Sequence, residues 1–159
     1  MKPEADGSKL LDGKDKEIAR FNVDTAGKVK IKSAADKVLG YVVTKDGCWK
    51  IENADKTTEL YILRRQDDGD YKLEDGADQE IYRVKARDYG FEVESPDKQS
   101  LYKVKVKNGK TYLINAADKP VFSTKSQVNP AAIASFGFDV LSKEQKAALA
   151  YAVNRSGGK

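Results

Sequence analysis

One unit recurs six times along this 159-residue chain, and the repeat constrains the fold more than any single motif. Each copy carries an aspartate that is followed by lysine or glutamine. Repeats of this length form one supersecondary unit each, and neighbouring units must pack together because a single unit cannot bury its apolar face. Successive aspartates lie 21, 19, 23, 19 and 21 residues apart, at Asp15, Asp36, Asp55, Asp78, Asp97 and Asp118.

Every copy has the same order of local patterns. A short run such as Trp49-Lys50-Ile51 alternates apolar and charged residues, which is typical of a strand with one buried face. The Asp-Lys turn follows, then a second alternating run such as Tyr82-Arg83-Val84, and then a glycine turn such as Asp68-Gly69. Aspartate suits the first turn because its side chain can bond nearby backbone, and Asp-Gly is a strong hairpin signal. The pattern predicts six β-hairpins, or twelve antiparallel strands, between residues 9 and 126.

Four units carry an aromatic residue at equivalent positions of their first strand. A row of aromatic rings can stack on bases or sugars. Each ring, however, shares its parity with the aliphatic residue two positions later, which favours the apolar interior of the fold. We therefore expect all four rings to face inward, together with Ile51, Leu73, Val93 and Ile114. The rings are Trp49, Tyr71, Phe91 and Tyr112.

The C-terminal segment Ser142–Val153 predicts a helix that other parts of the protein enclose. Ser142 and Gln145 have the spacing of a capping box, and the second half, Ala147–Val153, is apolar on every side. A helix that is apolar all round must be surrounded by protein or lipid. Its length of about 12 residues falls short of the roughly 20 that span a bilayer, so we expect protein around it.

Twelve alternating strands and one apolar helix predict a mainly β fold. We expect a closed 12-stranded antiparallel β-barrel of six hairpin repeats around a buried hydrophobic C-terminal α-helix. A closed barrel hides the apolar face and removes the sheet edges. At about 12 strands it is too wide for its own side chains to fill, so the helix serves as its plug. The alternative fold is an open hairpin solenoid or propeller-like array with the last helix as a cap.

The domain boundaries follow from this fold. Residues 1–8 are predicted to form a flexible polar N-terminal tail, and residues 9–155 a single domain. Within it the repeats occupy 9–126, a connecting segment 127–141 and the central helix 142–154. The pair Asn129-Pro130 predicts a short helical turn. Alternation of Phe136, Phe138 and Val140 predicts an extended piece that leads into the barrel.

The composition excludes several kinds of chemistry. The chain has no histidine and a single cysteine, Cys48, which rules out an internal disulfide, a structural zinc site and Ser-His-Asp or Cys-His catalysis. A net charge of +4 is too small for a dedicated nucleic-acid binder, and no phosphate-cradling glycine motif occurs. We therefore expect no enzyme, no catalytic residue, no cofactor, no metal ion and no nucleic-acid partner.

Two acidic features and the cysteine have a functional interpretation that we weigh against a simpler one. Each Asp-Lys turn offers one or two carboxylates, whereas calcium takes about 6–8 oxygens, so turn formation is the better account. The cluster Asp67–Asp70 could supply a pair of carboxylates for hydrolysis. We interpret it instead as a solvated hairpin tip. Cys48 is interpreted as an incidental thiol, because no histidine is present to activate it.

The chain resembles the tubby-like C-terminal superfamily, which covers the tubby domain, the phospholipid scramblases and the plant LURP-one-related proteins. Phe136–Leu141 running into Lys146–Val153 is similar to the scramblase end, where a phenylalanine-glycine stretch and a short acidic segment precede an apolar helix. The resemblance extends from Lys9 to about Asn154 and implies a 12-stranded barrel around a hydrophobic C-terminal helix. The cysteine-rich and proline-rich scramblase regions are absent, and the basic residues of tubby's phosphoinositide pocket have no residue-by-residue match.

By this resemblance we expect a non-enzymatic binding or scaffold module that binds anionic phospholipid headgroups peripherally. Each basic residue near an anionic surface contributes about 1 kcal/mol. The alternative interpretation is a solvated exterior, where surface lysines keep sheets from aggregating. The expected headgroup site consists of basic residues that end or alternate along predicted strands, namely Arg64, Arg65, Lys103, Lys105, Lys107 and Lys110.

The alternative function is a protein–protein interaction module, in one version the mature part of an exported lipoprotein. The start of the chain, Met1–Ser8, lacks the apolar region of a signal peptide. The compartment is left open: the chain as written would be cytoplasmic, and it would be exported or lipid-anchored if a signal sequence was removed. We expect a monomer whose partner is an anionic lipid surface or another protein.

Hydrogen exchange distinguishes the plugged barrel from the open array. If the helix is enclosed, the amides of Ala147–Val153 exchange as slowly as the best-protected strand amides, because they open only with the whole domain. Fast exchange of these amides would place the helix outside and favour the open array.

Overall fold

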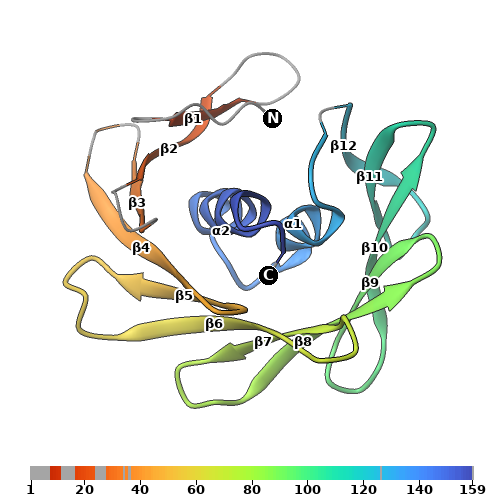
Figure 1. Cartoon of the computed structure of the whole chain (residues 1–159), viewed down its shortest axis with the longest axis horizontal. Coiled ribbons are helices and arrows are strands. Elements are labelled where there is room, and N and C mark those ends of the chain that lie inside the picture. The colour runs from red at the N-terminus through yellow and green to blue at the C-terminus, as the bar shows by residue number, and fades with distance from the viewer. Residues whose placement is uncertain are drawn as a thin grey trace.

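The computed structural model describes residues 8–11, 17–23, 28–33, 35, 37–125 and 127–158. Twelve antiparallel strands follow one another in sequence order across one sheet (Figure 1). The predicted tail and the repeat aspartates Asp15 and Asp36 lie outside the described residues, except for Ser8, with which β1 begins. The strands are β1 (Ser8–Leu11), β2 (Glu17–Val23), β3 (Val29–Lys32), β4 (Val38–Lys45), β5 (Cys48–Asn53), β6 (Glu59–Arg65), β7 (Tyr71–Asp75), β8 (Glu80–Arg87), β9 (Gly90–Glu94), β10 (Ser100–Lys107), β11 (Lys110–Asn115) and β12 (Pro120–Thr124).

The sheet curves around the helices without closing. In the described part of the chain, β1 pairs only with β2 and β12 only with β11, and Figure 1 shows them as the two separate ends of the sheet. The predicted closed barrel is therefore not confirmed, although the number, order and direction of the strands are as predicted. The two end strands span 4 and 5 residues, and the concave face encloses two helices, α2 and a shorter one described below.

Helix α2 (Lys143–Arg155) lies within the curve of the sheet and packs against β2, β3, β4, β5 and α1. Its start is the predicted capping box. Ser142 Oγ accepts a hydrogen bond from the Gln145 N–H at 3.1 Å, and Gln145 Oε1 accepts one from the Ser142 N–H at 2.9 Å. The apolar half of the helix, Ala147–Val153, is buried except for the half-buried Tyr151. The prediction of an enclosed helix is confirmed.

A second, short helix shares the concave face. Helix α1 (Pro130–Ala134) begins at Asn129, whose side chain accepts a hydrogen bond from the Ala131 N–H at 2.9 Å, as the Asn-Pro pair predicted. It packs against β9, β10 and β11, so that the two helices divide the sheet between them. The extended piece predicted after it is wrong, because the 3-10 helix η1 (Ser135–Gly137) continues the turn. Gly137 lies tightly against Tyr102, since an added Cβ would be 3.0 Å from the Tyr102 ring and the ring would have to shift.

The turn after each odd-numbered strand is held by a different residue from the one that the repeat aspartate suggested. In five turns the last residue of the strand, or the residue next to it, accepts a backbone N–H bond through its side chain. These residues are Ser33, Asn53, Asp75, Ser95 and Asn115. In four of these turns a later residue has positive φ, namely Lys56, Asp78, Lys98 and Asp118. The aspartate of the repeat therefore holds the left-handed position in two turns, and a lysine holds it in the other two.

The structure corrects the prediction that Tyr112 and Ile114 of β11 face inward. Trp49 and Tyr71 are 0% and 5% exposed, and Phe91 packs edge-on against Tyr71 with ring centroids 5.9 Å apart, so three rings face inward as predicted. In β11, Leu113 is 1% exposed and Thr111 is buried, whereas Tyr112 and Ile114 alternate with them and face outward. The run Tyr112-Leu113-Ile114 is apolar throughout, so it has no alternation to mark the inward face. Aligning Tyr112 with the other rings displaces β11 by one residue relative to its capping Asn115, and a displacement of one residue turns a strand over.

A β-bulge accompanies each of these turns. Six strand pairs show a register shift at the same place, where one residue of the second strand has no partner. A bulge bends its strand and increases the local twist, so one bulge per unit accounts for the curvature of the sheet. The unpaired residue is aliphatic in every unit, and it is Ile18, Leu39, Leu60, Ile81, Leu101 and Val121.

Charge substitutions in β11 test the corrected register. Leu113→Asp should lower the free energy of unfolding by at least about 3 kcal/mol, because it places an unpaired carboxylate in the core. Tyr112→Asp on the outer face should cost no more than about 1 kcal/mol. Urea unfolding of both variants measures the difference. Equal losses, or a larger loss for Tyr112→Asp, would contradict the register.

Candidate functional site

The six predicted basic residues do not form one site. Arg64 and Arg65 lie at the end of β6, whereas the four lysines lie on the hairpin of β10 and β11. Strands β7, β8 and β9 separate the two groups. Neighbouring strands are about 4.8 Å apart, so the groups stand on the order of 19 Å from each other along the sheet. They therefore cannot contact one small headgroup together.

Both arginines are already engaged within the protein. Arg64 Nε donates to Glu74 Oε1 at 2.7 Å, and Arg64 Nη1 donates to Cys48 Sγ at 3.6 Å. The hydrogen bond to Glu74 is the main reason why the pKa of Arg64 is raised. Arg65 has the opposite parity, and its side chain is hydrogen-bonded to Tyr71. Burial raises the pKa of Tyr71, and the hydrogen bond with Arg65 offsets part of that rise. Neither arginine presents a free guanidinium in the way that the headgroup site required.

The four lysines, which we call the lysine hairpin (Lys103, Lys105, Lys107 and Lys110), do lie together. The three in β10 project outward, since they alternate with Val104, which is fully buried. Alternate residues of a strand are about 7 Å apart, and Lys107 is directly opposite Lys110. None of the four forms an ion pair with a carboxylate among the described residues.

Two of these ammonium groups rest on aromatic rings. Lys105 Nζ lies 5.4 Å from the centre of the Tyr89 ring, and Lys110 Nζ lies 5.3 Å from the centre of the Tyr112 ring. The cation–π contacts hold the ammonium groups in place without neutralising them. Like charges directly opposite each other destabilise a sheet, and the Lys107–Lys110 pair is such a case. Glu92 of β9 lies opposite Lys103 and balances part of its charge. Towards the tip, Lys105, Lys107 and Lys110 form no ion pair among the described residues, so the positive charge is concentrated there.

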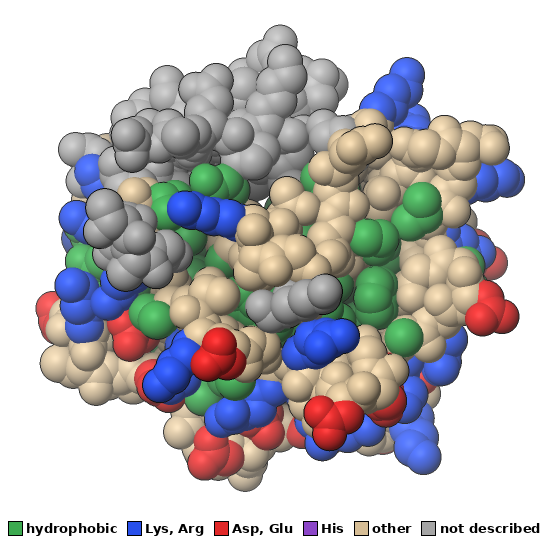
Figure 2. All heavy atoms as spheres, viewed as in Figure 1, with side chains coloured by type: hydrophobic (Ala, Val, Ile, Leu, Met, Phe, Trp, Pro, Cys, Tyr) green, Lys and Arg blue, Asp and Glu red, His purple; other side chains and the backbone are tan. Residues whose placement is uncertain are grey.

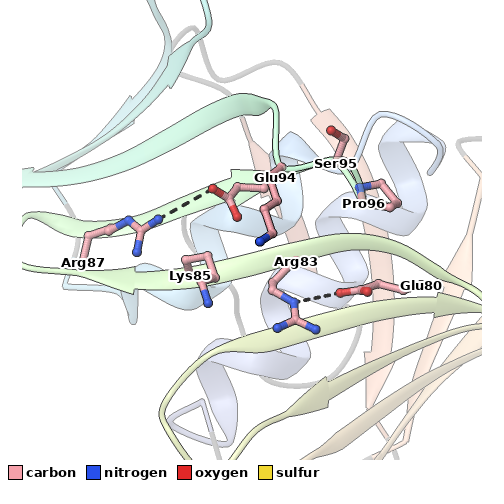
Figure 3. A pocket seen from close by; sticks show the side chains of 8 residues that line it. Glu80, Arg83, Lys85, Arg87, Glu94, Ser95 and Pro96 are labelled. Atoms are coloured by element: carbon pink, nitrogen blue, oxygen red, sulfur yellow. Dashed lines mark hydrogen bonds and ion pairs between the residues drawn. The ribbon is translucent and has the colours of Figure 1, made fainter.

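A groove on the same outer face shows the opposite arrangement. It encloses about 390 Å³ beside β8 and the turn after β9, and Figure 3 shows its labelled arginines and glutamates side by side. Arg83 Nε donates to Glu80 at 2.8 Å, and Arg87 Nη2 lies 2.9 Å from Glu92 and 3.6 Å from Glu94. These ion pairs compensate most of the charge of the groove, which makes it a weaker anion site than the lysine hairpin.

The carboxylates that balance this groove are held in their ionised form. A hydrogen bond from Ser100, followed by Arg87, lowers the pKa of Glu92 despite its partial burial. Burial disfavours the ionised carboxyl of Asp70, but hydrogen bonds from the Ala86 N–H and from Lys85 outweigh it and lower the pKa of Asp70. Lys85 Nζ is 3.0 Å from Asp70 Oδ2. The groove therefore stays compensated at neutral pH.

A tyrosine network at one end of the sheet was missed by sequence reasoning. Tyr102 Oη donates to Asp139 Oδ2 at 2.8 Å, and Lys146 Nζ lies 3.0 Å from Asp139 Oδ1. Tyr82 Oη accepts a hydrogen bond from the Val140 N–H at 3.1 Å. The recurrence of tyrosine in the second strand of successive units was the available signal. The network ties the connecting segment to β8, β10 and α2.

The chemistry of this network favours a structural role. Burial, together with the hydrogen bond to Asp139, raises the pKa of Tyr102 to about 12. A phenol that keeps its proton this strongly is a poor nucleophile and a poor base near neutral pH. Among the described residues no group of three or more cysteine or acidic side chains could hold a metal ion, and no helix is long and apolar enough to span a bilayer.

Comparison with known proteins identifies only distant structural likeness. No protein-family model and no curated protein matches the chain. A solved structure of a protein from Arabidopsis thaliana, AT5G01750, is similar over 74% of this chain and 85% of its own, with 18% sequence identity and a TM-score of 0.47. A lectin, described as the Japanese Marasmius oreades lectin, is similar over 76% of this chain and 82% of its own, with 14% identity and a TM-score of 0.22.

The tyrosine network predicts a loss of stability at alkaline pH. Because the pKa of Tyr102 is raised in the folded protein, its contribution is fully present below its ordinary value of about 10 and is lost as the pH rises towards 12. Tyr102→Phe should remove this part of the pH dependence, whereas Tyr112→Phe, outside the network, should keep it. Urea midpoints at about pH 9 and pH 11 provide the test. An unchanged pH dependence in Tyr102→Phe would contradict the assignment.

Proposed function

We propose that this chain is a non-enzymatic binding module whose lysine hairpin binds anionic phospholipid headgroups at a membrane surface. The observation that carries the proposal is the group of four outward lysines on one hairpin, of which Lys105, Lys107 and Lys110 have no carboxylate partner in the described part of the chain. Cations that are already paired gain little from a further anion. Cations that repel one another are stabilised when an anion settles between them.

The expected affinity is modest and depends on salt. Each lysine near an anionic surface contributes about 1 kcal/mol, so four lysines supply about 4 kcal/mol, enough for reversible and peripheral association. The attraction decays within a Debye length of about 8 Å at physiological ionic strength. Binding should therefore weaken as salt is added, and it should require a surface of many headgroups rather than one deep pocket.

Membership of the tubby-like superfamily is part of the same proposal. Its support is the antiparallel order of twelve strands together with the burial of the C-terminal helix α2. Closure of the sheet into a barrel belongs to this proposal as well, and it would require hydrogen bonds between β1 and β12. Arg64 and Arg65 are not included in the proposed headgroup site, because both are engaged elsewhere and lie far from the lysines.

Vesicle co-sedimentation tests the proposed function. The full chain should sediment with vesicles of phosphatidylcholine and phosphatidylserine and stay in solution with phosphatidylcholine alone. The double variant Lys105→Gln with Lys107→Gln should lower the partition coefficient roughly 30-fold, because it removes about 2 kcal/mol of attraction.

The matched control is Lys45→Gln with Lys119→Gln. These lysines are exposed and lie on other hairpins. Two lysines are replaced in each double variant, so the change in net charge is the same. The control should bind like the unmodified chain. Equal binding to neutral and anionic vesicles, or equal losses in both double variants, would overturn the proposal.

A further inference from the structure

The tip of the lysine hairpin borders an apolar hollow. The hollow has a volume of about 390 Å³ and lies between the turn that joins β10 to β11 and the chain that follows β12. Its wall includes two valines, the methyl-bearing side chain of a threonine and an open glycine position. The lining residues are Val106, Gly109, Thr111, Gln127 and Val128.

Val106 is the apolar side chain that the fold leaves most open at this end. It has the inward parity of Val104, but Val104 is fully buried and Val106 is 48% exposed. About half of the Val106 side chain is therefore left uncovered by the described residues. A Cβ added at Gly109 would meet no atom within 4 Å, which shows how open the turn is.

Two residues that line the hollow also belong to the protein core or contact it. Val128 is half-buried and packs against the core cluster. Thr111 is paired with Val106 across the two strands and is 5% exposed. An apolar group that entered the hollow would therefore lie against residues that are already dry.

Charge and apolar surface meet at the same place. Lys105 and Lys107 flank Val106 in the sequence and project to the other side of the strand, and Lys107 is opposite Lys110 at the turn. A partner that is anionic at one end and apolar at the other can satisfy both features at once. An anionic phospholipid has this chemistry, whereas inorganic phosphate gains nothing from an apolar wall.

We propose that the hollow receives the apolar part of an anionic phospholipid whose headgroup lies on the lysine hairpin. This inference rests on the proposed function and adds the orientation of the protein at the membrane. The hairpin tip points into the membrane, Val106 passes below the headgroups, and the opposite end of the sheet stays in water. Lysine side chains extend their charge back to the interface while their stems remain apolar.

A pair of valines provides the test. Val121 is 53% exposed and lies in β12, far from the hairpin tip along the strand direction. Val106→Asp should lower the partition coefficient on phosphatidylcholine–phosphatidylserine vesicles about tenfold or more, since it places a charge where an apolar contact is needed. Val121→Asp makes the same chemical change at the other end and should leave binding unchanged.

Tryptophan fluorescence adds a second readout that does not depend on affinity. The natural tryptophan, Trp49, is fully buried and gives a constant background. The emission of Val106→Trp should shift to the blue on anionic vesicles, and that of Val121→Trp should not. Emission at position 106 that does not move while the protein sediments would overturn the inference.

The two proposals fail in different ways. If Val106→Asp binds as well as the unmodified chain while the lysine double variant does not, the headgroup site stands and the apolar subsite is rejected. If the unmodified chain does not distinguish anionic from neutral vesicles, the proposed function itself is rejected, and the apolar subsite is rejected with it.

Discussion

The structure depends on the enclosure of α2 by the curved sheet. The buried positions of the helix are mostly alanine, including Ala147, Ala148 and Ala150, so the helix backbone comes close to its surroundings. Large side chains must then come from the sheet, and Trp49 and Leu73 are fully buried opposite the helices. A small core partner on the helix and large ones on the strands fill the curve at the density of a protein interior. Figure 2 shows hydrophobic side chains across the middle of one face, with basic and acidic side chains around its edge and some lysine or arginine near its centre.

This use of the inner face leaves binding to the outer face and the ends of the sheet. Outward positions are charged in most strands, and across β8 and β9 the charges pair with one another. The lysine hairpin differs because Glu92 lies opposite only Lys103, while the tip carries Lys107 against Lys110 with no ion pair among the described residues. Because the units repeat, pairs of opposite charges recur across the outer face. The lysine hairpin departs from this pattern, and the departure marks the proposed site.

The sequence allowed the element types, their order and the enclosed helix to be predicted, because alternation and all-round apolarity have direct structural meaning. Other features depend on tertiary packing. The Asn129-Pro130 pair predicted the helical turn of α1 but not its place on the concave face beside α2. The sequence placed Tyr112 inward because the run Tyr112-Leu113-Ile114 is apolar throughout, whereas the position of the capping residue Asn115 fixes Tyr112 on the outer face. Predicting that Arg64 lies far from the lysines requires knowledge of the strand order. Predicting the tyrosine network requires knowledge of the path of the connecting segment.

The enclosed helix is the last element in the chain, and this has a consequence for folding. Ribosomes deliver all twelve strands before α2, so the growing sheet has no core until residues near 150 emerge. Contacts that complete the domain join distant parts of the chain. The Trp49 indole N–H donates to Ser156 Oγ across 107 residues, and the Tyr71 hydroxyl donates to the Gly158 carbonyl across 87. Contacts of this range form slowly. The inner faces of the hairpins therefore stay exposed during synthesis, and a chain that stalls before α2 is a substrate for chaperones and proteases rather than a shortened domain.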